Sequence, residues 1–558
     1  MRIDYVRLAG LALLFFVPFL GGIHLLDWAE VNLAESAREM LLTGNYGHAQ
    51  IDFKPIWESP PLFLWLQVLS MKVFGVGEFA ARFPNVLCGL ATFLLVYHLG
   101  RRLHDRAFGW LWALAWLGSL LPHLYFRSGV VDPWFNLLVF GGLYGFIEFR
   151  WQFFTAHEAS SFWRRFRFLL LGGWLTGLAM LVKGPVALLV LLLTLLLYWA
   201  RYRFRNRGFF KHLVLFAGVA GSVLFAWLAL ESMEHGAWFA TEYFSHQMPA
   251  FDQPGTGSIG SRGLSVLMLL VGCFPVSVFA LPNLWGDHQS EDEMLDSDTL
   301  VSCKRSDLAT WMQLLFWVVL ILFSVLPGND APVASLAYFP LTYLGTLTIW
   351  RAFRWHIQPR ATGLLLLGLG IGIGLLQAAL PVIGNHVDWL QSWLTDNAFL
   401  NAQLNVDLHW HWWQGLPGLV LIAASLLAWY YWRQARPWVA AQTVFAGGAI
   451  FTAFTFLTCA GYMDRYTQCA AIEFYESKAG ENCQVKPVGF QTYAPLFYSR
   501  QRCSHEGLAK ADPSCFMPAN RPGQKVYLVA KIPHLDGLTG CREIYRHGGF
   551  VFLEQPPE

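Results

Sequence analysis

The chain has 558 residues, of which 55% are hydrophobic and only 14% are charged. A soluble globular protein carries about a quarter charged residues. Together with apolar runs that recur along most of the length, this composition excludes a soluble enzyme with a single anchor, a disordered chain and a repeat solenoid. The net charge of +2 gives no reason to expect a nucleic-acid partner. The sequence predicts a polytopic membrane protein that is all-α in the membrane and has membrane lipids as neighbours.

Transmembrane helices are expected where about 20 mainly apolar residues follow one another, because that length crosses the hydrocarbon core. No small-residue cleavage site follows the first such segment, so we expect a retained helix there rather than a signal peptide. About thirteen spans are predicted, at residues 7–26, 84–100, 107–124, 130–148, 166–182, 185–200, 213–230, 264–282, 310–327, 333–350, 362–382, 416–432 and 438–459.

The distribution of Lys and Arg predicts the orientation of these spans, since positive charge is retained on the cytoplasmic side. With a cytoplasmic N-terminus, the expected inner loops contain 21 Lys and Arg residues, and the outer loops before the tail contain 7. An odd number of spans then puts the C-terminal tail on the outer side. We assign the basic run from Arg201 to Lys211 to this topology rather than to nucleic-acid or lipid-headgroup binding.

The tail is predicted to be a domain of its own, with residues 1–460 forming the membrane domain and residues 461–558 an extracytoplasmic domain. Alternating apolar residues predict strands at 524–532 and 549–554, and a strand that leads into a short helix is expected at 489–499. These elements predict a small α/β domain.

Cysteine usage agrees with an outer location for the tail, because disulfides persist in oxidising compartments. The spacing fits neither a zinc ribbon nor a thioredoxin motif, so two disulfide bridges are expected, with the pairing left open. The tail contains five of the nine cysteines, namely Cys469, Cys483, Cys503, Cys515 and Cys541.

Two outer segments are too long to be simple connectors. In the first, residues 27–83, the apolar spacing between Val31 and Leu41 predicts an amphipathic helix along the membrane surface, ended by a turn at Gly44-Asn45. A second apolar helix is expected to start at Pro60-Pro61, since Pro is tolerated in a first helical turn. The other long segment, residues 231–263, is rich in glycine and is expected to be a mobile loop.

Seven strings in the membrane part stand out together: LAESAREM, WESPPLFLWLQ, KVFGVGEFAARFPN, SGVVDPWFN, LVKGPVALL, GCFP and YFPLTY. They resemble bacterial transferases related to the protein O-mannosyltransferases and to the lipid A aminoarabinose transferase. The likeness covers nearly the whole membrane part and is specific over residues 27–90. It implies the membrane glycosyltransferase fold called GT-C, in the bacterial inner membrane with a periplasmic tail. It also implies transfer of a sugar from a polyprenyl-phosphate carrier lipid to an extracytoplasmic acceptor.

The sequence departs from this family at four places. The family's Asp-Glu pair at the end of the first span falls on Ala29-Glu30, and its Glu-Lys-Pro-Pro reads Glu58–Pro61 with serine in place of lysine. More loosely, an expected His falls within 258–260, and an expected Lys and His fall within 327–333. Two readings of the function are therefore open. The chain is either a glycosyltransferase or a catalytically degenerate relative that serves as a scaffold, carrier-lipid binder or subunit of a larger membrane complex.

Three carboxylates are candidates for the acid–base chemistry that an inverting transfer needs. Glu30 is the carboxylate at the family's position and is the first candidate for the base that takes the acceptor's proton. Asp27 lies two positions before the family's Asp and could act only if the loop were wound differently. Asp132 begins a span and either helps to position the acceptor or caps the helix ahead of Pro133.

Three cations are candidates to bind the donor phosphate. Lys183 lies at the outer end of a span, before Gly184-Pro185, where it either meets phosphate or reaches to the headgroups. Arg262 could replace part of the missing positive charge, and Arg127 precedes the Asp132 motif. A divalent metal cofactor is neither required nor excluded, because Glu58 and His246 are only two weak candidate ligands and do not specify a metal.

Overall fold

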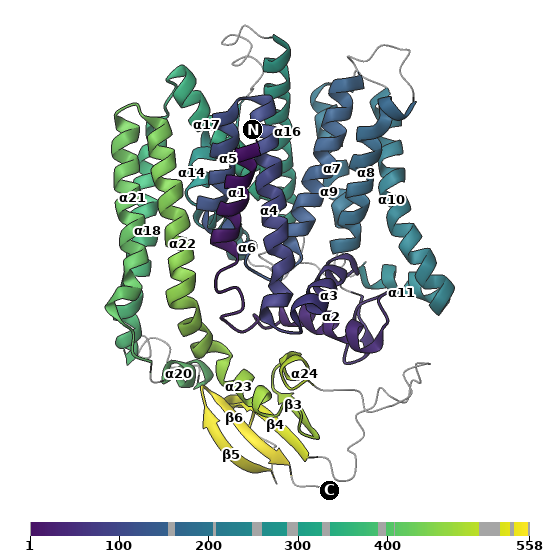
Figure 1. Ribbon diagram of the computed structural model, residues 1–558, viewed down its shortest axis with the longest axis vertical. Coiled ribbons are helices and arrows are strands. Elements are labelled where there is room, and N and C mark those ends of the chain that lie inside the picture. Colours follow the sequence, from purple (N-terminus) through teal and green to yellow (C-terminus); the bar gives the residue numbers. More distant parts are fainter. Residues whose placement is uncertain are drawn as a thin grey trace.

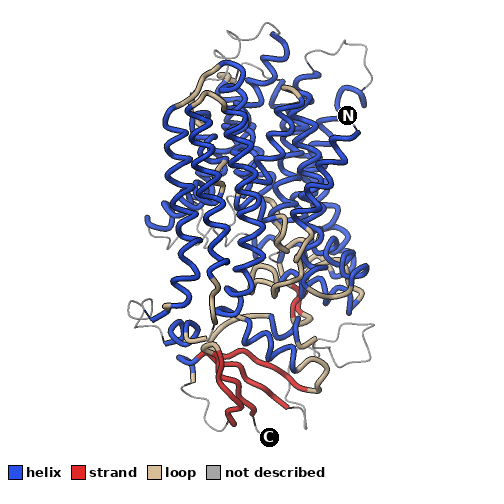
Figure 2. The backbone as a smooth tube through the Cα atoms, turned by 60° about the vertical axis from the view of Figure 1, so that its left-hand side comes forward, coloured by secondary structure: helices blue, strands red, loops and turns tan. Residues whose placement is uncertain are grey.

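A computed structural model describes residues 2–57, 59–153, 162–204, 208–247, 259–286, 299–325, 335–388, 398–406, 408–500, 525–535 and 541–555. The molecule consists of a large bundle of roughly parallel and antiparallel helices with a small mixed domain at one end (Figure 1). The tube view in Figure 2 shows that every strand of the four-stranded sheet belongs to this small domain. The N-terminus lies at the opposite end of the bundle.

The helical bundle has the composition of a multi-pass membrane domain. Within the described ranges, seven helices are long and apolar enough to cross a membrane. They are α4 (Glu78–Leu103), α8 (Phe162–Lys183), α10 (Gly208–His235), α16 (Thr299–Val325), α18 (Arg360–Asn385), α21 (Leu416–Arg433) and α22 (Pro437–Thr467). The polytopic all-α class is confirmed, whereas the number thirteen stays a prediction.

Further helices of the bundle are shorter or less apolar and run beside these seven (Figure 1). They are α1 (Arg2–Phe16), α5 (Arg106–Gly118), α6 (Leu120–Tyr125), α7 (Asp132–Phe153), α9 (Val186–Arg201) and α17 (Tyr338–Trp355).

One predicted span is not a straight helix. The segment expected at 264–282 consists of α13 (Ile259–Gly272) and α14 (Val276–Ala280), and the two parts are bent by 109°. Pro275 lies at the break and has no N–H to continue a helical hydrogen-bond ladder. The predicted span therefore becomes a broken one.

Close packing of α7 on α8 depends on glycine. A Cβ at Gly145 would lie 2.8 Å from the Cα of Gly172, and a Cβ at Gly172 would lie 2.7 Å from the carbonyl oxygen of Gly142. No side chain fits at these positions without separating the two backbones. Small residues at a helix interface bring backbones together, and the resulting contacts stabilise helix pairs in membranes.

The substitution Gly172→Val is therefore expected to destabilise the membrane domain by about 1–3 kcal/mol, the usual cost of overpacking a core. Thermal unfolding of the purified protein in detergent measures the effect. Gly218→Val is the matched control, because a Cβ at Gly218 in α10 would meet no atom within 4 Å. Equal losses in the two variants would contradict the packing argument.

The first long outer segment contains the two predicted helices. They are α2 (Val31–Thr43) and α3 (Leu62–Phe74), joined through the short strands β1 (Gln50–Ile51) and β2 (Lys54–Pro55). Gly44 ends α2 with a φ of 72°, a left-handed conformation that favours glycine. Both helices lie at the end of the bundle that faces the small domain (Figure 1).

The charged residues between the apolar positions of α2 lie inside the molecule, and the position of this helix along the membrane surface stays a prediction. Glu35, Arg38 and Glu39 are buried rather than exposed. Arg38 Nε donates to Glu35 at 2.7 Å, and Glu39 accepts from the backbone N–H groups of Asp52 and Phe53 at 2.8 and 2.9 Å. Burial, followed by repulsion from Glu35, raises the pKa of the Glu39 carboxyl to about 8. Hydrogen bonding inside the molecule replaces the solvent contact that the spacing predicted.

The second long segment also differs from its prediction as a mobile loop. Its first part completes α10, which ends at His235, and then forms α11 (Trp238–Gln247). Its end, from residue 259, belongs to α13. Residues 248–258, which hold two of the glycines behind the prediction, lie outside the described residues.

The C-terminal domain has the predicted α/β character. Its sheet has the strand order β3-β4-β6-β5, with β3 parallel to β4 and the other pairs antiparallel. Strands predicted at 524–532 and 549–554 are confirmed, but the strand expected at 489–499 lies earlier, in β3, and only its short helix α24 falls there. The elements are α23 (Cys469–Ser477), β3 (Cys483–Val488), α24 (Ala494–Tyr498), β4 (Lys525–Lys531), β5 (Arg542–His547) and β6 (Phe550–Gln555).

The expectation of two disulfide bridges is not met by the described cysteines. Cys469, Cys483 and Cys541 are free thiols. The other two tail cysteines, Cys503 and Cys515, lie outside the described residues. Three of the five sulfur atoms are thus unpaired, because α23 and the sheet hold them in separate places. The short α20 (Ala398–Leu404) and the 3₁₀ turns Leu281–Asn283, Trp412–Gly415 and Ile532–His534 complete the fold.

Candidate functional site

Two predicted site residues form an ion pair at the end of the bundle that carries the C-terminal domain. Lys183 ends α8, Asp132 begins α7, and Lys183 Nζ donates to Asp132 Oδ1 at 2.9 Å. Ser335 donates its hydroxyl to the same oxygen at 3.2 Å. The Asp132 side chain is only 6% exposed, whereas that of Lys183 is 26% exposed. An ammonium has three N–H bonds, and the described residues take one of them, so Lys183 can bind a further anion.

The backbone beside Lys183 contacts α11 and the first outer segment. Gly184 has a φ of 78°, and a Cβ there would lie 3.1 Å from Gln247 Oε1 and 3.5 Å from the Tyr243 hydroxyl. Gln247 in turn donates to the backbone carbonyl of Trp57 at 3.1 Å. Lys183, α11 and Trp57 therefore lie close together. They are brought together although 126 residues separate Trp57 from Lys183 in the sequence.

Glu30, the first candidate for the base, lies buried beside Arg82 of α4. Its carboxylate is 1% exposed and accepts from Arg82 Nη2 at 2.6 Å and Arg82 Nε at 3.1 Å. The backbone N–H of Leu26 donates to it at 2.9 Å, and the backbone N–H of Gly129 donates to it as well. Arg82 and the backbone thus direct four donors at this buried carboxylate.

The hydrogen bonds of Glu30 position the turn that leads to Asp132. Gly129 lies three residues before Asp132, and the neighbouring carbonyl groups of Ser128 and Val130 accept from Asn85 Nδ2 at 2.6 and 2.7 Å. Asn85 belongs to α4, as does Arg82. Through this turn, Glu30, Arg82 and Asn85 fix the place at which α7 starts.

Asp27 links the first outer segment to the C-terminal domain. It is exposed, and its Oδ1 accepts from the Thr492 hydroxyl at 2.7 Å and from the N–H of Trp28 at 2.8 Å. Its own N–H donates to Gln468 Oε1 at 3.0 Å. The Trp28 ring stacks on Tyr493 with 6.1 Å between ring centroids. These contacts place Asp27 at an interface between domains and give it no contact with Lys183.

The contacts of Arg127 are packing contacts between helices. Its guanidinium donates to the carbonyl oxygens of Phe15 and Pro18 at 3.2 and 2.6 Å, and it lies 4.0 Å above the Phe456 ring. It is buried. These contacts hold the C-terminal end of α1 against α22, and none of them involves Lys183 or Asp132.

The remaining predicted residues are only partly described. Arg262 lies in α13, but its side chain is outside the described residues, as is Glu58. His246 is exposed on α11, where its Nδ1 lies 3.1 Å from the Glu242 carbonyl oxygen, and its ring is 6.0 Å from that of Trp57. Of the two weak metal candidates, the structure therefore places only His246, which lies beside Trp57.

A second ion pair joins the segment between α1 and α2 to α22. His24 Nδ1 lies 2.6 Å from Asp464 Oδ2. Burial opposes the charged imidazole, but the hydrogen bonds and charges of Asp464 and Cys469 together outweigh it and raise the pKa of His24 to about 10. This pair adds to the contacts by which the start of the tail fixes the segment between α1 and α2.

A raised histidine pKa in the folded state predicts a pH dependence of stability. The contribution of His24 is present in full below its unfolded pKa of 6.5, and it is lost as the pH rises toward 10. We therefore expect the melting temperature to fall between pH 6.5 and 10, and to fall less in a His24→Gln variant. Thermal unfolding across this range measures the difference, with His98→Gln as the control at a more exposed histidine. A His24→Gln variant that keeps the full pH dependence would contradict the assignment.

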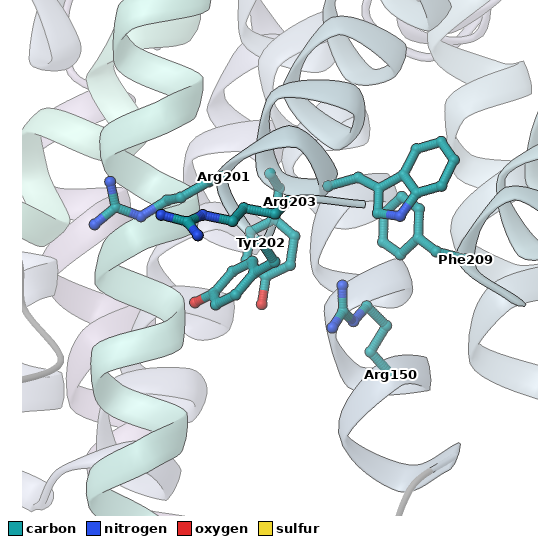
Figure 3. A pocket seen from close by; sticks show the side chains of 7 residues that line it. Arg150, Arg201, Tyr202, Arg203 and Phe209 are labelled. Carbon is teal, nitrogen blue, oxygen red and sulfur yellow. The ribbon is translucent and has the colours of Figure 1, made fainter. Parts of the chain in front are cut away.

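A pocket of about 430 Å³ lies at the other end of the bundle, away from these residues (Figure 3). It is lined by Arg150, Arg201, Tyr202, Arg203 and Phe209, with two further aromatic side chains. Arg150 lies 4.6 Å above the Tyr198 ring and 5.1 Å above that of Phe209. The sequence assigned these arginines to inner loops, and their position opposite the C-terminal domain agrees with that topology.

Sequence reasoning missed Arg82 and Asn85, which hold Glu30 and the turn before Asp132. Both lie inside one of the strings that carry the family resemblance, KVFGVGEFAARFPN. The signal that could have found Arg82 is an arginine two residues before the predicted span at 84–100. A charge at that depth needs a buried partner.

Comparison with known families agrees with this fold. Residues 58–227 match the family described as dolichyl-phosphate-mannose-protein mannosyltransferase. This match covers α3 to α10, including Asp132 and Lys183.

Among individual relatives, the chain is similar to undecaprenyl phosphate-alpha-4-amino-4-deoxy-L-arabinose arabinosyl transferases. That of Photorhabdus laumondii is 24% identical over 51% of this chain and 51% of its own length, and that of Erwinia tasmaniensis is 26% identical over 56% and 54%. In these matches the chain aligns with about half of the relative's length.

The three-dimensional likeness extends over the whole chain. The crystal structure of ArnT from Cupriavidus metallidurans bound to undecaprenyl phosphate superposes with a TM-score of 0.72 over 99% of both chains, at 19% sequence identity. The apo form of the same protein gives a TM-score of 0.71. The chain is therefore a multi-pass membrane protein with the GT-C fold and a small C-terminal α/β domain.

Proposed function

We propose that the protein is a membrane glycosyltransferase, which transfers a sugar from a polyprenyl-phosphate donor to an acceptor. The transfer takes place at the membrane face that carries the C-terminal domain. The observation that carries the proposal is the partly exposed ammonium of Lys183, held beside the buried Asp132 where α7, α8 and α11 meet. The crystallised ArnT of the same fold is described as bound to undecaprenyl phosphate, which supports a lipid of this class as the ligand.

In the proposed reaction the C1–O bond between the sugar and the phosphate breaks, and a bond forms between C1 and an acceptor oxygen. The departing phosphate gains negative charge, and the two free N–H bonds of Lys183 donate to its oxygens. Asp132 orients the ammonium through its own hydrogen bond. The acceptor's proton passes to a carboxylate, and polyprenyl phosphate leaves as the second product.

The contacts of the three candidate carboxylates change the proposed base from Glu30 to Asp132. Glu30 is engaged by Arg82 and two backbone donors, and Asp27 is engaged by Thr492. Asp132 lies beside the ammonium of Lys183. Asp132 is hydrogen-bonded as well, to Lys183 and Ser335, but Lys183 is the proposed phosphate ligand, so its partner carboxylate lies next to the reacting groups. We therefore propose Asp132 as the carboxylate that acts in the reaction, and Glu30 as a positioning residue that fixes the turn before it.

The bacterial inner membrane, with the C-terminal domain in the periplasm, is the location that this function requires. Polyprenyl-phosphate sugars are used on the outer face, and the positive-charge rule puts the ends bearing Arg150 and Arg201 in the cytoplasm. Cysteine labelling with a membrane-impermeant reagent in intact spheroplasts tests the orientation. The single-cysteine variants Lys478→Cys and Arg433→Cys place the label at the outer and inner ends of the molecule. Labelling at position 433 but not 478 would contradict it.

The direct test of function is mass spectrometry of the protein purified gently from its native membrane, with bound lipids and stoichiometric proteins scored together. Copurified polyprenyl phosphate, followed by turnover with a polyprenyl-phosphate sugar, supports the transferase. A constant protein partner without carrier lipid contradicts it and favours the degenerate relative as a complex subunit.

The alternative function rests on one specific observation, the alanine at position 29. Ala29 is exposed in the outer segment, and Ser59 stands where the family has lysine. Restoring Ala29→Asp and Ser59→Lys tests this alternative. Turnover that appears only in the double variant assigns the natural chain to the degenerate class, whereas turnover in the natural chain rejects that class.

A further inference from the structure

Outside the Lys183 region, two histidines and a glutamate converge at the same end of the bundle. His48 belongs to the first outer segment, just before β1, whereas Glu231 and His235 lie one turn apart at the end of α10. His48 Nδ1 lies 3.1 Å from Glu231 Oε2, and His235 Nδ1 lies 3.6 Å from the same oxygen. All three candidate ligand atoms lie within 4.8 Å of one another.

The two separations to the Glu231 oxygen match those between ligands on one zinc ion, and the two histidine ligand atoms are at most 4.8 Å apart. With metal–ligand bonds of about 2.0–2.1 Å, two ligands of a tetrahedral site are about 3.3–3.4 Å apart. The two separations to the Glu231 oxygen bracket this value. Two imidazoles and a carboxylate are a ligand set that Zn²⁺ accepts.

The backbone around His48 is shaped to bring the three groups together. A Cβ at Gly47 would overlap the Glu231 carboxylate, so a larger residue there would displace this carboxylate from His48. The carbonyl oxygen of Gly47 accepts from Trp227 Nε1 at 2.9 Å, which fixes the segment on α10. His48 and Glu231 are both buried.

The side-chain amide of Gln50 can orient the His48 ring. His48 Nε2 lies 3.2 Å from the side-chain amide of Gln50. A histidine that binds metal through Nδ1 donates its other N–H to a neighbouring acceptor, and the amide oxygen of Gln50 is that acceptor once the amide is turned over. Without a metal, the same groups form a chain in which Gln50 donates to His48 and His48 donates to Glu231.

We propose that His48, Glu231 and His235 bind a zinc ion, with water as the fourth ligand, and that this ion fixes the first outer segment to α10. Phe239 of α11 packs against the rings of His48 and His235 and against that of Trp57. The ion therefore stabilises the arrangement in which Trp57 and α11 border Lys183. The site is separate from Glu58 and His246, and the proposal does not depend on transferase activity.

The test measures metal content in the full-length protein, purified in detergent with a tag that contains no histidine. Inductively coupled plasma mass spectrometry after addition of Zn²⁺ and dialysis is expected to give about one zinc per chain. His48→Gln and Glu231→Gln are expected to lose it, whereas the matched control His246→Gln keeps it. Zinc that is lost in His246→Gln but kept in His48→Gln would overturn the proposal, as would no bound zinc at all.

A measurement on the unmodified chain guards against variants that fail to fold. Zinc K-edge X-ray absorption is expected to show only nitrogen and oxygen ligands, with the multiple-scattering signature of two imidazoles. A sulfur ligand would overturn the proposal, because it would assign the ion to Cys469 beside His24 and Asp464. Chelation is also expected to lower the melting temperature of the unmodified chain and to leave that of His48→Gln unchanged.

Discussion

Replacing Lys183 with methionine is expected to reduce sugar transfer by about 100-fold or more, the usual effect of removing one donor to a developing negative charge. The ammonium is the only side-chain cation among the described residues that contacts Asp132. Radiolabelled transfer from a polyprenyl-phosphate sugar measures the effect. Lys211→Met is the matched control, because Lys211 lies at the start of α10, at the opposite end of the bundle.

Lys183→Met by itself leaves the Asp132 carboxylate buried without its partner, which destabilises the fold as well as the site. The double variant Asp132→Leu with Lys183→Met removes both charges together. We expect it to keep a melting temperature near that of the natural chain while transfer remains lost. A double variant that folds and retains transfer would contradict the proposed role of the pair.

Glu30→Gln is expected to impair folding rather than only catalysis. It leaves Arg82, which is 3% exposed, without its charged partner. Breaking a buried ion pair in this way costs about 3–5 kcal/mol. Thermal unfolding and the yield of monodisperse protein measure the loss, and Glu543→Gln in an exposed pair with Arg546 is the control, expected to leave the melting temperature nearly unchanged.

The same variant separates the two roles considered for Glu30. If Glu30 were the catalytic base, Glu30→Gln would fold normally, bind the donor and transfer no sugar. If it positions the turn before Asp132, donor binding and stability fall together. Arg82→Lys is expected to share the loss of stability, because a single ammonium cannot replace the five hydrogen bonds that Arg82 donates to Glu30 and to the carbonyls of Leu20, Ile23 and His24.

Local patterns in the sequence predicted the elements well where one rule dominated. The turn at Gly44 and the helix after Pro61 followed from conformational preferences of glycine and proline, and the strands from 525 and 550 followed from alternation. Patterns failed where tertiary contacts decided the outcome. Glu35 and Glu39 are buried because Arg38 and the backbone of Asp52 and Phe53 supply hydrogen bonds that no local pattern encodes.

The site was predicted in part, for the same physical reason. Lys183 and Asp132 were each named as candidates, but their pairing joins positions 51 residues apart and required the geometry. Glu30 was named for its place in a motif, and the structure gives it a bidentate contact to Arg82, 52 residues away. Motif position named these residues, whereas the contacts of each side chain came only from the structure.

The contacts of the segment between α1 and α2 have a consequence for the order of synthesis. Asp27, His24 and Trp28 are held by Thr492, Asp464 and Tyr493, which a ribosome adds more than 400 residues later. A nascent chain can insert most of its helices before this segment finds its partners. The segment between α1 and α2 can therefore reach its final structure only after the C-terminal domain has been synthesised. A prematurely terminated chain would occupy the membrane without this segment fixed in place.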